Sequence, residues 1–182
     1  MTATTLPEQM YAVDPSHTSA EFIVRHFMIS KVRGRFSAVA GTIALAQGSH
    51  IRSSISATLE ASSIATGDAQ RDGHLASADF FDAATFPQLT FRSTGISGQG
   101  DEFELRGDLT IRDTTLPIVL AATYEGETTD PWGNRRVGFE AHGKINRKDF
   151  GLIWNQALET GGVAIGDEVK IELAVEAVAH TA

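Results

Sequence analysis

The chain has 182 residues, of which 42% are hydrophobic and 21% are charged, a composition typical of one soluble globular domain with a sizeable core. A formal net charge of −8 argues against sequence-independent binding to nucleic acid or to an anionic membrane surface, because both need basic groups that contact phosphates. The absence of cysteine excludes disulfides, thiolate nucleophiles and thiolate metal ligands.

The first residues, MTATTLPEQM, have neither the basic residues nor the apolar core of a signal peptide. No apolar run approaches the roughly 18 residues of a membrane-spanning helix. We therefore expect a cytoplasmic protein with no integral membrane segment and no nucleic acid partner. We predict a flexible tail over residues 1–9, a single domain over residues 10–178 and a C-terminal tail over residues 179–182.

The first two predicted strands are a short edge strand at residues 10–13 and a longer strand that contains the sequence EFIVRHF, residues 21–27. Side chains alternate between the two faces of a strand, so Phe22, Val24 and His26 share one side. A histidine thus ends an apolar row. It is a candidate ligand contact, catalytic base or partly buried structural residue.

Residues 32–45 form the next predicted strand, and the inward phase changes within it. Every second residue from Val32 to Phe36 faces inward, and the next inward residue is Val39, one position later than the alternation predicts. One extra residue restores the inward direction, so we predict a β-bulge near Ser37 and Ala38.

The later part of the chain shows the same alternation of apolar and polar residues. We predict strands at residues 51–61, 89–96, 103–111, 116–125, 136–145 and 169–176. A helical segment is expected only at residues 68–77, where Gly73 weakens the helix propensity.

The connections between these strands sort into two kinds. Short turns rich in Gly, Pro or Asp occur at residues 47–48, 98–100 and 130–133. Two long connections span residues 62–88 and 147–166. In an up-and-down meander, the tight turns fall at one end of the sheet and the long connections, with the predicted helix, fall at the other.

An antiparallel sheet of about eight strands with one continuous apolar face closes most naturally into a β-barrel. We therefore predict an all-β, up-and-down antiparallel β-barrel whose mouth is covered by one short helical segment. The alternative is a two-layer sandwich with a filled core.

Four segments together resemble the YceI-like family: residues 14–36 (DPSHTSAEFIVRHFMISKVRGRF), 71–94 (RDGHLASADFFDAATFPQLTFRST), 107–120 (GDLTIRDTTLPIVL) and 145–155 (INRKDFGLIWN). The resemblance extends over residues 10–178. It implies a lipocalin-like barrel that binds long apolar molecules such as polyisoprenoids in its interior and is often a homodimer. Many family members carry a signal peptide and are periplasmic, and this chain departs from that pattern.

A tunnel for a prenyl chain needs a long apolar lining, since burial contributes roughly 0.8 kcal/mol per methylene-sized unit. The candidate tunnel residues share the inward phase: Phe22, Val24, Phe36, Val39, Phe91, Leu105 and Phe139. The alternative is that they fill a solid core. Small inward residues such as Gly107 and Gly143 leave volume that something must occupy.

The mouth of the predicted barrel collects aromatic residues and hydrogen-bond donors. Candidate contacts for the mouth or a ligand head group are His26, Arg71, His74, Leu75, Phe81, Phe86 and Trp154. A diphosphate or quinone head group needs donors, and one helical turn brings Arg71 and His74 to the same face. The alternatives are that Arg71 pairs with a neighbouring aspartate and that Arg112, Arg147 and Lys148 are solvated surface charges.

These observations predict a non-enzymatic protein that binds, transports or stores an isoprenoid or similar long-chain lipid. The bound molecule would be an isoprenoid lipid or an isoprenoid quinone, with no other cofactor and no metal. Two alternatives stay open: an enzyme that acts on an apolar substrate with His26 or His74 as general base, and a haem or metal carrier that uses His26.

Overall fold

The structure of the protein is a computed structural model that describes residues 8–46 and 49–180. Most of the predicted N-terminal tail, the predicted turn at residues 47–48 and the last two residues therefore lie outside the described residues. In the described part, the strands are β1 (Glu8–Val13), β2 (Ser19–His26), β3 (Ser30–Phe36), β4 (Val39–Ala46), β5 (Ser49–Glu60), β6 (Ile64–Ala65), β7 (Gln88–Gln99), β8 (Glu102–Ile111), β9 (Thr114–Thr129), β10 (Arg135–Asn146) and β11 (Ile165–Ala179). The helices are α1 (Ala69–Ala76) and the 3₁₀ turns η1 (Ala61–Ser63) and η2 (Arg147–Phe150).

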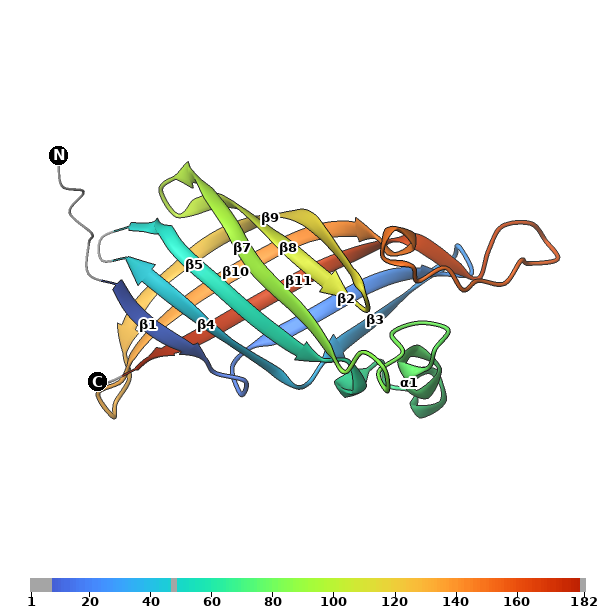
Figure 1. The fold of residues 1–182 in the computed structure, drawn as a ribbon, viewed down its shortest axis with the longest axis horizontal. Helices are drawn as coiled ribbons and strands as arrows, with labels where there is room; N and C mark the ends of the chain where they lie inside the picture. The colour runs from blue at the N-terminus through green and yellow to red at the C-terminus, as the bar shows by residue number, and fades with distance from the viewer. Residues whose placement is uncertain (1–7, 47–48, 181–182) are drawn as a thin grey trace.

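These strands form one antiparallel sheet that closes on itself. Their order is β1-β4-β5-β7-β8-β9-β10-β11-β2-β3-β6, with an additional pairing between β1 and β11. The pairs β1/β2, β3/β4 and β5/β6 each share one position around the barrel, because both members of a pair bond to the same neighbouring positions. The predicted up-and-down barrel of eight positions is thus confirmed (Figure 1).

The phase change near Ser37 is an interruption between β3 and β4, so the predicted β-bulge in a continuous strand is wrong. The next position around the barrel breaks beside it, at η1. The Ser37 amide donates to the Ser63 carbonyl at 3.2 Å, and the Glu60 amide donates to the Ala38 carbonyl at 3.0 Å. Both positions bend together, which keeps the side chains before and after the break directed inward.

β1 is the strand that closes the barrel, and the predicted edge position for it is wrong. It lies between β4 and β11, with Tyr11 opposite both Ile43 and Ala179. The strand begins at Glu8, so the ordered barrel extends into the predicted tail at residues 1–9. At the other terminus, Ala179 belongs to β11 and not to the predicted C-terminal tail.

The two kinds of connection lie at opposite ends of an elongated molecule (Figure 1). The tight β7–β8 and β9–β10 turns lie at the end where both described termini are found, which we call the floor. The β2–β3 turn, α1 and the long β10–β11 connection lie at the other end, the mouth.

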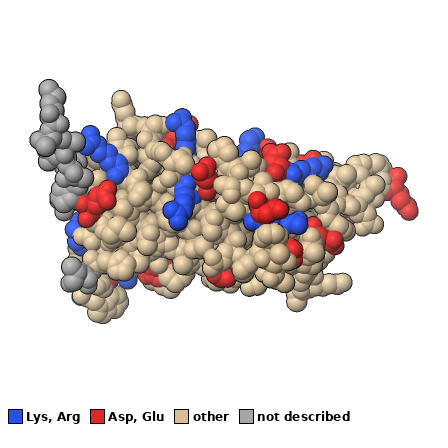
Figure 2. Space-filling model, in the orientation of Figure 1, with Lys and Arg blue, Asp and Glu red and all other residues tan. Residues whose placement is uncertain are grey.

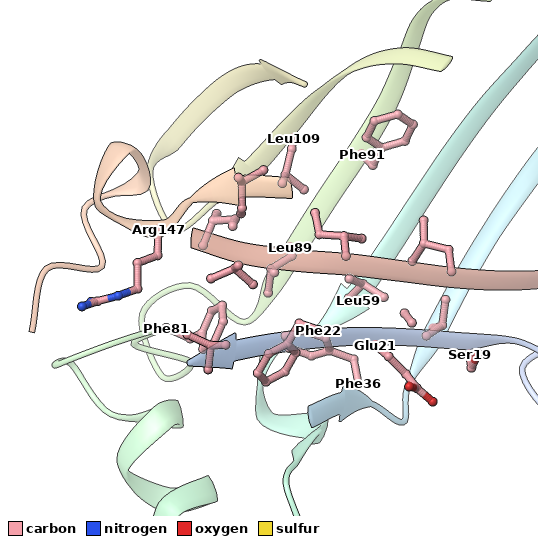
Figure 3. A pocket seen from close by; sticks show the side chains of 18 of the residues that line it. Ser19, Glu21, Phe22, Phe36, Leu59, Phe81, Leu89, Phe91, Leu109 and Arg147 are labelled. Carbon is pink, nitrogen blue, oxygen red and sulfur yellow. The ribbon is translucent and has the colours of Figure 1, made fainter. Parts of the chain in front are cut away.

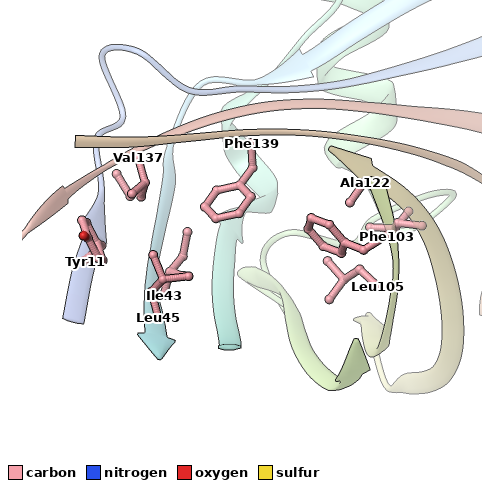
Figure 4. Packing of buried hydrophobic residues seen from close by; sticks show 10 residues of the cluster. Tyr11, Ile43, Leu45, Phe103, Leu105, Ala122, Val137 and Phe139 are labelled. Atoms are coloured by element: carbon pink, nitrogen blue, oxygen red, sulfur yellow. The ribbon is translucent and has the colours of Figure 1, made fainter. Parts of the chain in front are cut away.

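Two clusters of buried side chains occupy the barrel interior. The floor cluster consists of Tyr11, Ile43, Leu45, Phe103, Leu105, Leu120, Ala122, Val137, Phe139 and Ala177 (Figure 4). The mouth cluster consists of Phe36, Ala61, Ile64, Phe80, Leu89, Leu109, Ile111, Phe150 and Leu152. Phe91 packs against both clusters, so it lies midway along the barrel.

Candidate functional site

A cavity of about 460 Å³ runs inside the barrel between the two clusters (Figure 3). Its volume lies within the range of roughly 300–1,000 Å³ that is usual for small-molecule sites. Members of the floor cluster and of the mouth cluster both contribute to its wall, which is overwhelmingly apolar. All seven predicted tunnel residues line it: Phe22, Val24, Phe36, Val39, Phe91, Leu105 and Phe139.

Partial exposure of inward-facing side chains indicates that this interior is hollow. In a solid core such side chains are almost completely buried. Phe22, Phe91 and Val175 line the cavity and are only half-buried, because one side of each faces open volume. Near the floor, by contrast, Tyr11 and Val137 are almost fully buried. The space is therefore concentrated in the middle and toward the mouth.

Two glycines in the wall let aromatic rings lie flat against the sheet. A Cβ atom at Gly34 would lie 2.2 Å from the ζ carbon of Phe22, its partner across β2 and β3. At Gly107 it would lie 2.2 Å from the ζ carbon of Phe91. The predicted free volume above Gly107 is thus occupied by an aromatic ring, which shapes the wall of the cavity.

Helix α1 is tied to the barrel through Thr66. Arg71 lines the cavity, and its Nε and Nη2 atoms donate to the Thr66 hydroxyl at 2.7 Å and the Thr66 carbonyl at 2.9 Å. Asp72 accepts from the Thr66 amide and hydroxyl at 2.8 and 2.6 Å. The Asp68 side chain accepts from the Arg71 amide at 2.9 Å and caps the helix, which holds the pKa of Asp68 below its usual value.

His74 joins α1 to the long β10–β11 connection. Its ring packs edge-on against Trp154 and Phe80, with centroid distances of 4.7 and 5.1 Å. Its Nε2 atom lies 2.9 Å from Asp79 Oδ2. These contacts form a clamp across the mouth. Leu75 and Phe81 lie beside it and also line the cavity.

Arg147 is buried at the mouth, so its interpretation as a solvated surface charge is wrong. It is 4% exposed and lines the cavity. Its guanidinium donates to the carbonyl oxygens of Gly166, Leu152 and Trp154 at 2.9, 2.6 and 2.9 Å. Burial lowers the pKa of Arg147, and the Asp167 carboxylate partly opposes that effect. Arg147 therefore fastens the β10–β11 connection to the start of β11.

The last two predicted mouth residues differ in their position. His26 lines the cavity and stacks on Phe27 with a centroid distance of 3.8 Å. Phe86 is not part of the cavity wall. The guanidinium carbon of Arg112 lies 5.8 Å from the centroid of the Phe86 ring, outside the cavity.

One group of side chains that could ligate a metal occurs among the described residues, where the β1–β2 connection meets β11. It consists of Asp14, His17 and Glu176. Arg136 donates to Asp14 at 2.9 Å and to Glu176 at 2.5 Å, so a cation already occupies the centre of these carboxylates. This group is built as an ion-pair network.

The fold and the cavity define a class of protein: a closed antiparallel barrel with a hollow apolar interior and a mouth covered by a short helix and a long connection. In the described part of the chain, no helix is long and apolar enough to cross a membrane. Comparison with known proteins specifies the family. The model of the YceI-like domain matches residues 11–177, and the chain belongs to this family.

Relatives agree with this assignment. Protein YceI of Escherichia coli O157:H7 is 39% identical over 144 residues, 78% of this chain and 75% of that protein. Protein YceI of Salmonella newport is 36% identical over 170 residues, 92% of this chain and 86% of that protein.

Solved structures show the same fold. BcnA of Burkholderia cenocepacia matches with a TM-score of 0.78 at 22% identity, over 90% of this chain and 98% of that chain. The Campylobacter jejuni YceI protein matches with a TM-score of 0.75 at 28% identity, over 86% and 90%. A polyisoprenoid binding domain from Saccharophagus degradans matches with a TM-score of 0.70 at 14% identity, over 93% and 98%.

Proposed function

We propose that this protein binds a long-chain apolar lipid of the isoprenoid class in its barrel cavity and carries or stores it without chemical change. The observation that carries the proposal is the apolar cavity with half-buried aromatic residues along its wall. Burial of a prenyl chain contributes roughly 0.8 kcal/mol per methylene-sized unit, so such a cavity supplies affinity without specific polar contacts. The name of the Saccharophagus degradans domain supports the same ligand class.

The mouth supplies groups for a polar head. The Nε and Nη2 atoms of Arg71 donate hydrogen bonds to Thr66, and its Nη1 atom has no partner among the described residues. His26 lies on the same cavity wall. We propose that these two side chains contact the head group of a diphosphate or quinone while the chain extends toward the floor cluster.

Native mass spectrometry of the purified protein, followed by solvent extraction, tests the proposal. We expect one long prenyl or acyl species per chain. Phe91→Asp places a carboxylate midway along the cavity and should remove this species. Val119→Asp is the matched control, because Val119 is 51% exposed on β9 and does not line the cavity.

An empty protein, or a Phe91→Asp variant that retains its lipid in full, would contradict the proposal. A porphyrin or metal signal would favour a carrier of that class. Turnover of a prenyl substrate would favour an enzyme. His74 and Asp79 form a pair in the mouth with the spacing of an acid–base dyad, and the ring of His74 packs edge-on against Phe80 and Trp154.

A further inference from the structure

The turn between β2 and β3 lies at the mouth and carries three consecutive exposed apolar side chains, and the β10–β11 connection beside it extends farther from the barrel (Figure 1). Phe27, Met28 and Ile29 are 45%, 54% and 83% exposed. Ile153 in the β10–β11 connection is 67% exposed at the same end. Figure 2 shows this right-hand end as mostly uncharged surface, apart from an acidic group at its extreme tip. We call residues 27–29 the apolar tip.

The backbone of the apolar tip is unfavourable for the residues that occupy it. The Ile29 amide donates to the His26 carbonyl at 3.2 Å, which closes a β-turn. Its central residues, Phe27 and Met28, have φ values of 50° and 61°. Positive φ at both positions is the mark of a type I′ turn, in which Asn and Gly are strongly preferred. Folding alone favours Asn-Gly here, so the apolar side chains point to a function.

The apolar tip begins where the cavity reaches the surface. Phe27 lines the cavity and is also exposed, and Gln156 in the neighbouring connection has the same two properties. An apolar molecule that passes this point into water exposes its methylenes one after another, at a cost in free energy. Passage is favourable only if a second apolar phase meets the protein here.

Basic side chains lie directly behind the tip. Arg25 and Lys31 are exposed and face each other across β2 and β3, and Lys170 on β11 lies opposite Ile23 of β2. At about 3.3 Å per residue, Arg25 and Lys31 stand roughly 7 to 10 Å behind the tip. Like charges in opposed positions destabilise a sheet. We call these three residues the basic collar.

The basic collar has no ion-pair partner within the described residues, whereas several charges near it are paired. Arg33, one step farther from the mouth, is neutralised by Glu21 and Glu172 at 2.7 and 2.6 Å. The acidic residues near the start of β11 are engaged as well, Glu168 by Lys144 at 3.0 Å and Asp167 by Lys148 at 3.0 Å. The collar therefore presents local positive charge on a protein whose net charge is negative.

From these observations we propose that the mouth docks on the surface of a phospholipid bilayer that contains anionic lipid. The apolar tip enters the interface, and the basic collar contacts the lipid phosphates. The distance from the tip to Arg25 and Lys31 matches the roughly 5–10 Å depth to which interfacial apolar groups insert. The purpose of docking, exchange of the bound lipid, rests on the proposed function.

Flotation with phosphatidylcholine vesicles, with and without about one third phosphatidylglycerol, tests this proposal on the full chain. We expect flotation with the mixed vesicles, weaker flotation with pure phosphatidylcholine, and a fall with added salt. Met28→Asn combined with Ile29→Thr should reduce vesicle affinity about tenfold. Neither residue lines the cavity, and Asn tolerates positive φ, so the melting temperature should be unchanged or higher.

Two further variants separate the parts of the surface. Lys31→Thr combined with Lys170→Thr, neither of which lines the cavity, should remove the preference for anionic vesicles while leaving weak binding to phosphatidylcholine. Trp132→Ser is the matched control: Trp132 is 82% exposed in the β9–β10 turn at the floor, and its loss should leave flotation unchanged.

The proposal is overturned if the unmodified chain does not float, if the tip variant floats equally well, or if Trp132→Ser abolishes flotation. It is also overturned if the tip variant converts a dimer into a monomer on size exclusion without any effect on flotation, since the tip would then contact a second copy. Native mass spectrometry of the same samples reports lipid content separately, so failure of docking and failure of lipid binding are distinguishable.

Discussion

Gly34 controls the position of the Phe22 ring in the cavity wall. A Cβ atom at this position would overlap the ring, with contacts of 2.2 and 2.6 Å to its ζ and ε1 carbons. The far end of a side chain can move where the backbone cannot, so Gly34→Ala should swing the ring into the cavity. The affinity for a long prenyl alcohol should fall roughly tenfold, and the affinity for a short one should fall less.

Competition of prenyl alcohols of two lengths against a fluorescent fatty probe measures this effect. Gly95→Ala is the control, because a Cβ atom at Gly95 meets nothing within 4 Å and its φ is ordinary. Equal affinities for Gly34→Ala and the unmodified protein would mean that the ligand does not pass Phe22.

A second prediction concerns Arg71 and its proposed contact with the ligand head group. Charge-assisted hydrogen bonds contribute about 1.5–3 kcal/mol, so Arg71→Ala should weaken a prenyl diphosphate roughly ten- to a hundredfold and a prenyl alcohol of equal length much less. Titration of the two ligands by calorimetry gives the ratio.

The control for Arg71 is Thr66→Val, which removes the hydroxyl that accepts from Arg71 and keeps the charge. Loss of this hydrogen bond should loosen α1 and so change the affinities for the prenyl diphosphate and the prenyl alcohol equally. A similar equal loss in Arg71→Ala would exclude Arg71 from the head-group site.

Single residues also mark the limit of inference from sequence. The alternation of apolar residues predicts the tunnel wall, since inward direction follows from strand periodicity. Arg147 could not be found this way. Its partners are carbonyl oxygens of Leu152, Trp154 and Gly166, which come together only when an irregular connection folds back on the barrel. The sequence carries no periodic signal for such a contact.

Strands show a similar division between what periodicity predicts and what it misses. The phase change locates the irregularity at Ser37 correctly, because a lost inward phase must be restored. It does not distinguish a bulge from a break. The difference depends on whether the neighbouring position also bends, and that is set by η1, more than twenty residues later in the chain.

Helix α1 is a short element held at the mouth by the His74 clamp in addition to its hydrogen bonds with Thr66. Aromatic pairs contribute about 0.5–1.5 kcal/mol each, and His74 makes two, with Trp154 and Phe80. His74→Ala should therefore speed ligand release about tenfold, with faster amide hydrogen exchange in α1.

Stopped-flow transfer of a fluorescent lipid to acceptor vesicles measures the release rate. His50→Ala is the matched control, because His50 also stacks on aromatic residues, Tyr124 at 5.0 Å and Phe103 at 5.4 Å, but at the floor. If both variants release ligand at the unmodified rate, the mouth opens by a movement other than that of α1.

At the scale of the whole molecule, closure of the barrel is reinforced by one ion-pair network. Arg136 on β10 contacts Asp14 in the β1–β2 connection, Asp130 in the β9–β10 turn and Glu176 on β11. These carboxylates belong to segments far apart in the sequence that meet only when β11 closes against β1. The network therefore stabilises the closed barrel as a whole rather than any single strand.

The pH dependence of stability follows from this network. Hydrogen bonds from Ser16 and then Arg136 hold the pKa of Asp14 far below its usual value, and those from Asn134 and then Arg136 do the same for Asp130. A carboxylate with a lowered pKa in the folded state stabilises the protein above its unfolded pKa of about 3.9, and this stabilisation is lost as the pH falls below that value. The melting temperature should thus fall steeply between about pH 4 and pH 2.

Arg136→Met should lower the melting temperature at pH 7 by several degrees, because three mostly buried carboxylates lose their common partner. The drop between pH 7 and pH 3 should become smaller, since part of each lowered pKa comes from Arg136. Arg106→Met is the control: within the described residues Arg106 pairs only with Glu104, on an exposed face, where an ion pair adds little. Thermal unfolding by circular dichroism at both pH values measures the difference. Equal melting temperatures for Arg136→Met and the unmodified protein would mean that the backbone pairing of β1 with β11 closes the barrel without help from this network.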